Sequence, residues 1–349
     1  MKSVSDGESA GGSAADYVEA QPAFFGDLVA VGAADTFFKV GHFALRALSL
    51  RGAVLRLALP TLVEARKATA DIPGLELVEW DKADLRTLEA AVRGFRTILL
   101  VPPLDGDTVA FAGAVLNVGA ALRARVIVIG GQARPGGLIF PSPASADIEA
   151  LAARAATEVT VLRLPFFLEN LLWHARRVSA GAAFAYPVAA DVRFAAITCA
   201  DVGEFVAALA SVPRSAALPS LQVVDLSDAP PRTSMREIAA LLATALGRAD
   251  VLYTEVSAAA FATDLEAQRI TAAGAQEMVA LWRATAAADA ELEDDADFYL
   301  RRAAGASAFA AALCRDFISA DAWIKTHACC FRGPNLCRVH PMPPRPHAP

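Results

Sequence analysis

The C-terminal part of the chain gathers the side chains best suited to bind a soft metal ion. His327, Cys329, Cys330, Cys337 and His340 lie close together in sequence, and the last three of them could meet one zinc ion. Their spacing is not that of a familiar zinc finger or knuckle, no second CxxC-type pair accompanies them, and the surroundings are rich in proline. We therefore predict an irregular tail with oxidisable thiols and no metal site.

Histidines and hydroxyl groups in the middle of the chain are the candidates for proton transfer. We interpret His42 and His174 as helix-surface residues rather than proton donors. Ser142 precedes a proline, which is a turn signal, and Ser145 stands where it can cap the following helix. Capping is favoured over the alternative, in which these serines bind a ligand.

The overall composition predicts a folded globular protein. Of the 349 residues, 55% are hydrophobic, which is enough for a sizeable core. The formal net charge of −6 excludes a general attraction to nucleic acid or to an anionic membrane, and the apolar runs are far too short to span a bilayer. Because four of the five cysteines lie near the C-terminus, they do not form a disulfide framework for a whole domain, which favours a reducing, cytoplasmic location.

Short β-rich runs alternate with helical runs from Leu28 onward. This alternation predicts a doubly wound parallel sheet with helices on both faces. The predicted strands are Leu28–Gly32, Ala53–Leu59, Leu75–Trp80, Thr97–Val101, Val126–Ile129 and Val159–Leu164. The predicted helices between them are Val40–Leu50, Leu85–Val92, Val109–Leu122 and Ala146–Ala156.

The order loosens after about Ser211, where the pattern predicts a smaller, α-rich cap. Its predicted elements are a strand at Leu221–Val224, a capped helix from Thr233 to Leu246, a short strand near Val251–Thr254 and helices through Phe317.

Four short sequence motifs are distributed over the region from about Leu28 to Gly247. They are the loop GAADTFF at 32–38, VEWD at 78–81, RLPFFLENL at 163–171 and ITCADV at 197–202. Together they resemble the NmrA-like branch of the atypical short-chain dehydrogenase/reductase proteins. The resemblance implies a Rossmann-like fold that binds NAD(P)(H).

The glycine loop departs from the Gly-Ala-Thr-Gly-x-x-Gly pattern that the resemblance implies. Only the first glycine is present, as Gly32, and Asp35 and Phe38 stand at the second and third positions. The carboxylate repels a pyrophosphate, and the ring fills space where helix and strand pack closely. These changes predict weak or lost dinucleotide binding, unless Gly41 and the next helical turn rebuild the loop.

The usual signals for NAD or NADP preference are missing. Pro60 stands where the resemblance implies an arginine for the 2′-phosphate of NADP, and no carboxylate is there to bind a ribose hydroxyl. Arg56, Arg66 and Lys67 are nearby substitutes, although surface ion pairs explain them equally well.

The resemblance also assigns site roles to residues at strand ends. The implied cofactor-binding residues are Gly32, Ala33, Asp35, Thr36, Phe37, Phe38, Asp81, Val101 and Pro102. The implied wall of a substrate pocket between cofactor and cap consists of Pro165, Phe166, Phe167 and Asn170. The alternatives are a capping or loop role for Asp81, a strand end at the prolines, and ordinary core packing for the phenylalanines.

No catalytic residue follows from the sequence. Active short-chain reductases use a Tyr-x-x-x-Lys pair, but this chain has no tyrosine between Tyr17 and Tyr186, and Ser145 stands where NmrA-like members often keep a lysine. We favour a regulatory or redox-sensing protein with weak nucleotide binding, for which a protein partner stays open. The alternatives are an NAD(P)H-dependent oxidoreductase of a quinone-like or other flat apolar substrate, and an interaction module closed around Phe38.

The sequence thus divides into four expected parts. Residues 1–23, rich in glycine, serine and alanine, form a disordered lead without the features of a secretory signal. Residues 24–215 form the NmrA-like dinucleotide-binding domain, 216–326 the cap or substrate region, and 327–349 the irregular tail rich in proline and cysteine.

The loop departure generates a direct test. The double variant Asp35→Gly/Phe38→Gly removes the repulsive charge and the large ring, and glycine lowers the backbone cost of a left-handed conformation by about 1 kcal/mol. We expect it to bind NADPH and NADH more tightly than the parent in a fluorescence titration. Equal affinity of the two proteins would contradict this account of the loop.

Overall fold

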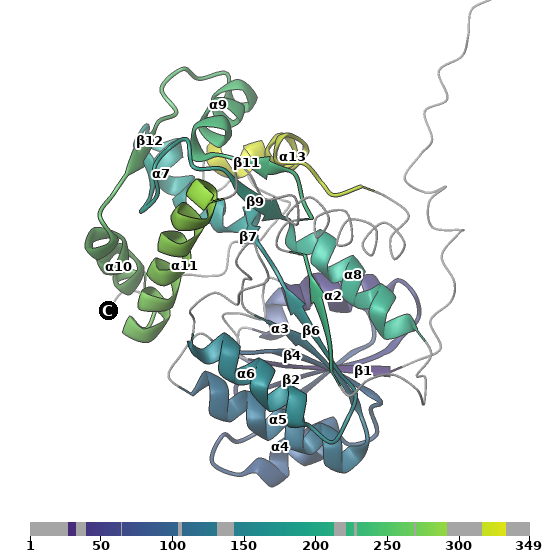
Figure 1. Cartoon of the computed structure of the whole chain (residues 1–349). Helices are drawn as coiled ribbons and strands as arrows, with labels where there is room; N and C mark the ends of the chain where they lie inside the picture. The colour runs from purple at the N-terminus through teal and green to yellow at the C-terminus, as the bar shows by residue number, and fades with distance from the viewer. Residues whose placement is uncertain are drawn as a thin grey trace, which may run out of the picture.

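A parallel sheet organises the computed structural model, which describes residues 27–32, 40–63, 65–103, 107–130, 143–212, 221–226, 229–268, 270–291 and 316–332. The sheet has seven strands in the order β10-β6-β5-β4-β1-β2-β3 (Figure 1). They are β1 (Asp27–Gly32), β2 (Val54–Leu59), β3 (Leu75–Glu79), β4 (Thr97–Val101), β5 (Arg125–Ile129), β6 (Val159–Arg163) and β10 (Leu221–Asp225). The order of the first six is that of a doubly wound fold, so the predicted fold class is confirmed.

Helices cover both faces of this sheet because its central strands are apolar on both sides. Alternate residues of β1 enter different cores: Ala30 packs on one face and Val31 on the other. The first face is covered by α2 (Val40–Ser49), α3 (Ala65–Ala68) and α8 (Cys199–Ser211). The second face is covered by α4 (Leu85–Val92), α5 (Thr108–Leu122) and α6 (Pro143–Arg154) (Figure 1).

Local capping explains why several helices begin where the sequence predicts. Asp84 caps α4 by accepting a hydrogen bond from the backbone N–H of Arg86. Ser234 and Glu237 form a capping box at the start of α9 (Met235–Leu246), and Gly247 ends this helix in the left-handed conformation. The predicted capped helix is therefore confirmed, with its first helical residue two positions later.

The helices α2 and α8 lie in close backbone contact. A Cβ atom at Gly203 of α8 would lie 2.6 Å from Phe43 Cβ and 2.8 Å from the backbone nitrogen of Ala44. Only glycine allows the two helices to approach this closely, so this position fixes how α8 packs against α2.

The cap is built from segments on both sides of α8. Its small sheets are β11-β9-β7 and β12-β8, and the strands are β7 (Phe166–Phe167), β8 (Phe184–Tyr186), β9 (Phe194–Ile197), β11 (Arg232–Thr233) and β12 (Tyr253–Glu255). Its helices are η1 (Leu168–His174), α7 (Ala175–Ser179), α9, α10 (Ala258–Ala267), α11 (Ala272–Glu291) and α13 (Ala320–Arg332). Buried aromatic and aliphatic side chains from these elements form a core separate from the two cores of the sheet.

The expected boundary at residue 215 does not separate sheet from cap. β10, which the sequence assigned to the cap region, pairs in parallel with β6 as the edge strand of the main sheet. Conversely, residues from Phe166 onward already belong to the cap core. The reason is that the chain enters the cap after β6, returns to the sheet through α8 and β10, and enters the cap again.

The first six residues of the expected irregular tail are helical. His327 to Arg332 form the last turns of α13, in which His327, Cys330 and Phe331 are buried. Apolar side chains of α13 pack into the cap core, and this packing stabilises a helix that the local composition did not indicate. Residues 333–349 lie outside the described part of the chain.

None of the helices in the described ranges combines the length and the apolar character that a bilayer-spanning segment requires.

The contact between α2 and α8 predicts opposite effects of one substitution at two helical glycines. Gly203→Ala should lower the free energy of unfolding by about 2 kcal/mol, because the new methyl group meets backbone atoms of Phe43 and Ala44. Gly113→Ala in α5 is the matched control, since its methyl group would lie an ordinary 3.6 Å from Leu151 Cδ1. We expect this control to stabilise the protein by up to about 1 kcal/mol through helix propensity. Equal effects in urea denaturation would contradict the close packing.

Candidate functional site

The candidate site lies at the carboxyl edge of the sheet, between β1 and β4. The chain winds outward in opposite directions from these two strands, and such a switch point is where doubly wound folds bind ligands. Gly32 ends β1 opposite Val101 of β4, and a Cβ atom on Gly32 would lie 2.7 Å from the Val101 carbonyl oxygen. The neighbouring strand therefore requires glycine here. The other implied loop residues, Ala33, Asp35, Thr36, Phe37 and Phe38, lie outside the described residues.

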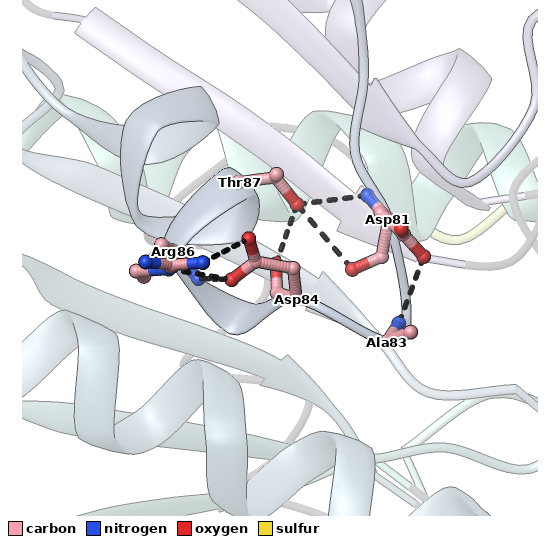
Figure 2. Close-up of polar contacts among 5 residues, drawn as sticks. All are labelled: Asp81, Ala83, Asp84, Arg86 and Thr87. Atoms are coloured by element: carbon pink, nitrogen blue, oxygen red, sulfur yellow. Dashed lines mark hydrogen bonds and ion pairs between the residues drawn. The ribbon is translucent and has the colours of Figure 1, made fainter.

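Asp81 shapes the turn that leads from β3 into α4 (Figure 2). Its carboxylate Oδ1 accepts a hydrogen bond from the Ala83 N–H at 2.9 Å, and its own N–H donates to Thr87 Oγ1 at 2.8 Å. Thr87 Oγ1 in turn donates to the Asp84 carbonyl oxygen at 2.6 Å. These contacts match the loop-carboxylate alternative, while the side chain stays exposed at the carboxyl edge.

The three basic residues near the end of β2 have different environments. Arg56 donates to Glu76 at 2.8 Å and to the Ala91 carbonyl oxygen at 2.7 Å, and its guanidinium lies 4.5 Å from the Phe95 ring centre. It is therefore held within the fold. Arg66 is exposed on α3, directly after the turn that follows β2. The side chain of Lys67 lies outside the described part.

Residues 101–103, at and directly after the end of β4, are tied to the start of α5. Val101 is buried and Pro102 is half-buried. The carbonyl oxygen of Pro103 accepts a hydrogen bond from Thr108 Oγ1 at 2.6 Å, which ties the segment to the first residue of α5. Val101 is paired with Gly32 at the carboxyl edge, and Pro102 directly follows it.

The two phenylalanines of β7 face different cores, because successive residues of a strand point in opposite directions. Phe166 is buried in the cap, with its ring centre 5.4 Å from that of Phe194 and 5.2 Å from that of Trp282. Phe167 is only half-buried and packs against the core of the main sheet. Core packing therefore describes Phe166, and Phe167 is the better candidate for a pocket wall. Pro165, just before β7, is buried.

Both described tyrosines donate their hydroxyl groups to backbone carbonyls. Tyr186 OH donates to the carbonyl oxygen of Asn170 at 3.0 Å, and Tyr253 OH donates to that of Tyr186 at 2.9 Å. Burial raises the pKa of both phenols above the usual range. Neither hydroxyl is arranged to transfer a proton to a ligand at neutral pH.

Glu169 is a buried carboxylate to which the sequence reasoning assigned no role. It is buried, and its carboxylate accepts hydrogen bonds from the Cys199 N–H at 3.0 Å and from Trp323 Nε1 at 3.2 Å. Burial raises the pKa of this carboxyl, and the N–H donors oppose that shift. The only sequence signal was an acidic residue inside the apolar run that follows β6, and its partners are distant in sequence.

The two histidines of the matched region differ from their predicted surface positions. His42 is partly buried, with Nε2 3.6 Å from Asp71 Oδ2. His174 is only 2% exposed, and its ring centre lies 4.9 Å from that of Tyr186. Neither of its ring nitrogens has a hydrogen-bond partner within the part of the chain that the structure describes. The surface interpretation of His174 was wrong because η1 turns this residue into the aromatic core of the cap.

The remaining polar candidates lie in separate places, as far as the structure describes them. α6 begins at Pro143, so Ser145 lies within its first turn rather than before it, and Ser142 lies outside the described residues. His327 stacks on Trp323 at 4.3 Å, and Cys329 is a free thiol. Among the described residues, no three His, Cys, Asp or Glu side chains are grouped so that they could hold a metal ion.

Known structures resemble this fold over most of the chain. No protein-family model and no curated protein sequence matches it. The NADPH complex of the quinone oxidoreductase QOR2 of Escherichia coli has a TM-score of 0.63 at 18% identity, covering 85% of this chain and 98% of that one. NmrA, a negative transcriptional regulator, in complex with NAD has a TM-score of 0.59 at 12% identity, covering 86% and 94%.

A third similar structure is the triphenylmethane reductase of Citrobacter sp. in complex with NADP(H), with a TM-score of 0.62 at 14% identity, covering 86% of this chain and 99% of that one. The chain shares the fold of these three proteins. The similarity extends across both the sheet and the cap, since nearly the whole length of each relative is covered. The resemblance seen in four short segments is thereby confirmed at the level of the fold.

His174 generates a prediction about pH. Burial lowers its pKa from 6.5 to about 4, so the unfolded chain binds a proton at higher pH than the folded one. The part of the free energy of unfolding that depends on neutral His174 is therefore fully present above about pH 6.5 and is lost as the pH falls toward 4. In urea denaturation at pH 7 and pH 4, the parent should lose about 3 kcal/mol more than His174→Leu. Parallel losses in the two proteins would show that His174 does not cause the acid sensitivity.

Proposed function

We propose that the chain is an NAD(P)-binding regulatory or redox-sensing protein that binds its nucleotide weakly. Two features support nucleotide binding at the edge between β1 and β4: this edge is the switch point of the sheet, and the exposed Arg66 follows β2. The three solved structures named above, which share this fold, are complexes with NADPH, NAD and NADP(H). Asp35 and Phe38 in the loop after β1 act against tight binding.

The regulatory role is supported by the contacts of the tyrosine hydroxyls and of the phenylalanine ring that a reductase would use for proton transfer and substrate binding. The hydroxyls of Tyr186 and Tyr253 are engaged with backbone carbonyls inside the cap. Phe166 is surrounded by other aromatic rings rather than facing an open pocket. A protein whose candidate proton donors and pocket wall serve cap packing is suited to bind a nucleotide and respond to it without rapid turnover.

A second function is favoured by one specific observation. Phe167 is half-buried and lies against the sheet core, so it could support a flat acceptor beside a nicotinamide. Hydride transfer to a quinone-like substrate depends mainly on positioning, and a displacement of about 1 Å can cost around a hundredfold in rate. An NAD(P)H-dependent oxidoreductase of a flat apolar substrate is therefore the alternative.

Titration of the purified chain with NADPH and NADH tests the proposed nucleotide binding. Arg66→Ala should weaken NADPH binding about tenfold and leave NADH binding unchanged, because only NADPH carries the 2′-phosphate that an exposed guanidinium can pair with. Arg46→Ala is the matched control: Arg46 is also exposed but lies in the last turn of α2, toward the opposite edge of the sheet. Equal weakening of both nucleotides, or an equal effect of Arg46→Ala, would contradict this assignment.

Turnover with a quinone panel separates the two functions. We expect any reduction to be slow and unaffected by Tyr186→Phe, because this hydroxyl is buried and bound to the Asn170 carbonyl oxygen. Slow turnover that Phe167→Ala reduces would favour the oxidoreductase. Absence of turnover together with measurable nucleotide binding would favour the sensor, and fast turnover abolished by Tyr186→Phe would refute the account of the site.

A further inference from the structure

Two buried carboxylates meet at the N-terminal end of α8. Glu169 comes from η1 and accepts the N–H of Cys199, the first residue of the helix. Asp201 comes from the first turn of α8, and its Oδ2 accepts the hydroxyl proton of Thr198 at 2.8 Å. Thr198 also caps the helix by accepting the N–H of Asp201 at 2.9 Å. Carboxylates at a helix N-terminus are stabilised by the helix dipole.

The same two carboxylates hold the C-terminal part of the described chain. The N–H of Ile318 donates to Asp201 Oδ2 at 3.1 Å, and Trp323 Nε1 donates to Glu169 Oε1 at 3.2 Å. Glu169, Asp201 and Trp323 are each at most 7% exposed, so water does not compete for these contacts. Hydrogen bonds to buried carboxylates are stronger than neutral ones, and losing one leaves a costly unsatisfied group.

The segment 316–332, which contains α13, bridges the sheet and the cap. Phe317 packs against the sheet core that α2 and α8 cover. Trp323, Ile324 and Phe331 are buried in the cap core, where α13 lies beside α9 and α7 (Figure 1). The position of this segment therefore depends on how the cap sits on the end of α8.

The end of α8 that contacts this segment lies at the same edge of the sheet as the candidate nucleotide site. The Arg125 guanidinium, at the start of β5, donates to the carbonyl oxygens of Leu209 and Ala210 at the far end of α8. The N-terminal end of α8 is thus at the carboxyl edge of the sheet. α2 also begins at that edge, directly after the implied cofactor loop, and contacts α8 at backbone distance around Gly203.

We propose that the segment 316–332 is a latch whose closure on Glu169 and Asp201 is coupled, through α8 and α2, to occupancy of the nucleotide edge. This inference rests on the proposed nucleotide binding. It states that a bound nucleotide stabilises the closed latch. By thermodynamic reciprocity, a closed latch strengthens nucleotide binding by the same factor. α13 would then be the surface that carries the nucleotide signal to the outside of the protein.

The full-length chain and two variants test this linkage. Trp323→Phe keeps a ring in the cap core and removes the N–H donor to Glu169, and Glu169→Gln keeps the shape of the side chain while removing its charge. Lys325→Ala is the matched control on the same helix, since Lys325 is exposed and pairs along α13 with Asp321 at 2.6 Å. Hydrogen exchange of the α13 amides is measured with and without NADPH, alongside the dissociation constant of NADPH.

In the parent and in Lys325→Ala, NADPH should slow exchange in α13. In Trp323→Phe and Glu169→Gln, exchange in α13 should be faster and NADPH should bind at least about fivefold more weakly. Faster exchange with an unchanged dissociation constant would overturn the linkage and leave the nucleotide site intact. If the parent binds neither NADPH nor NADH, the proposed function fails, and the linkage fails with it.

Discussion

The parallel pairing of β1 with β2 on one side and β4 on the other is the constraint on which the architecture depends. Since the later strands are added outward in opposite directions from these two, the carboxyl edge at Gly32 and Val101 is the switch point of the sheet. The apolar faces of the strands then require helices on both sides. α2 and α8 can cover one of these faces together only because Gly203 lets their backbones approach.

The elements that were predictable are those whose signals are local. α4 and β4 have the predicted boundaries because Asp84 caps the one and a continuous apolar run forms the other. The strands β7 and β11 have two residues each, too few to show an alternation of apolar and polar side chains. They are strands because they pair with β9. β10 was assigned to the wrong layer because a half-exposed strand does not indicate which sheet it joins.

The candidate site was predictable in outline but not in its contacts. Gly32, Asp81, Val101 and Pro102 lie at the carboxyl edge because parallel strands bring their ends together. The roles of Phe166, His174 and Glu169 depend on partners from distant segments, such as Trp282 and Trp323, and no pattern within a window of sequence contains that information. Burial of an imidazole and of a carboxylate is decided by tertiary packing rather than by local propensity.

The interleaving of sheet and cap also limits how such a protein can unfold and evolve. The chain passes from sheet to cap at β7, back through α8 and β10, and again into the cap through β11 and α9. No single boundary in the sequence separates sheet from cap, because both the sheet and the cap contain elements from two separate segments of the chain. The layers are therefore expected to melt in one cooperative step rather than as independent units. In such an architecture the cap cannot be exchanged by replacing one continuous segment of the chain.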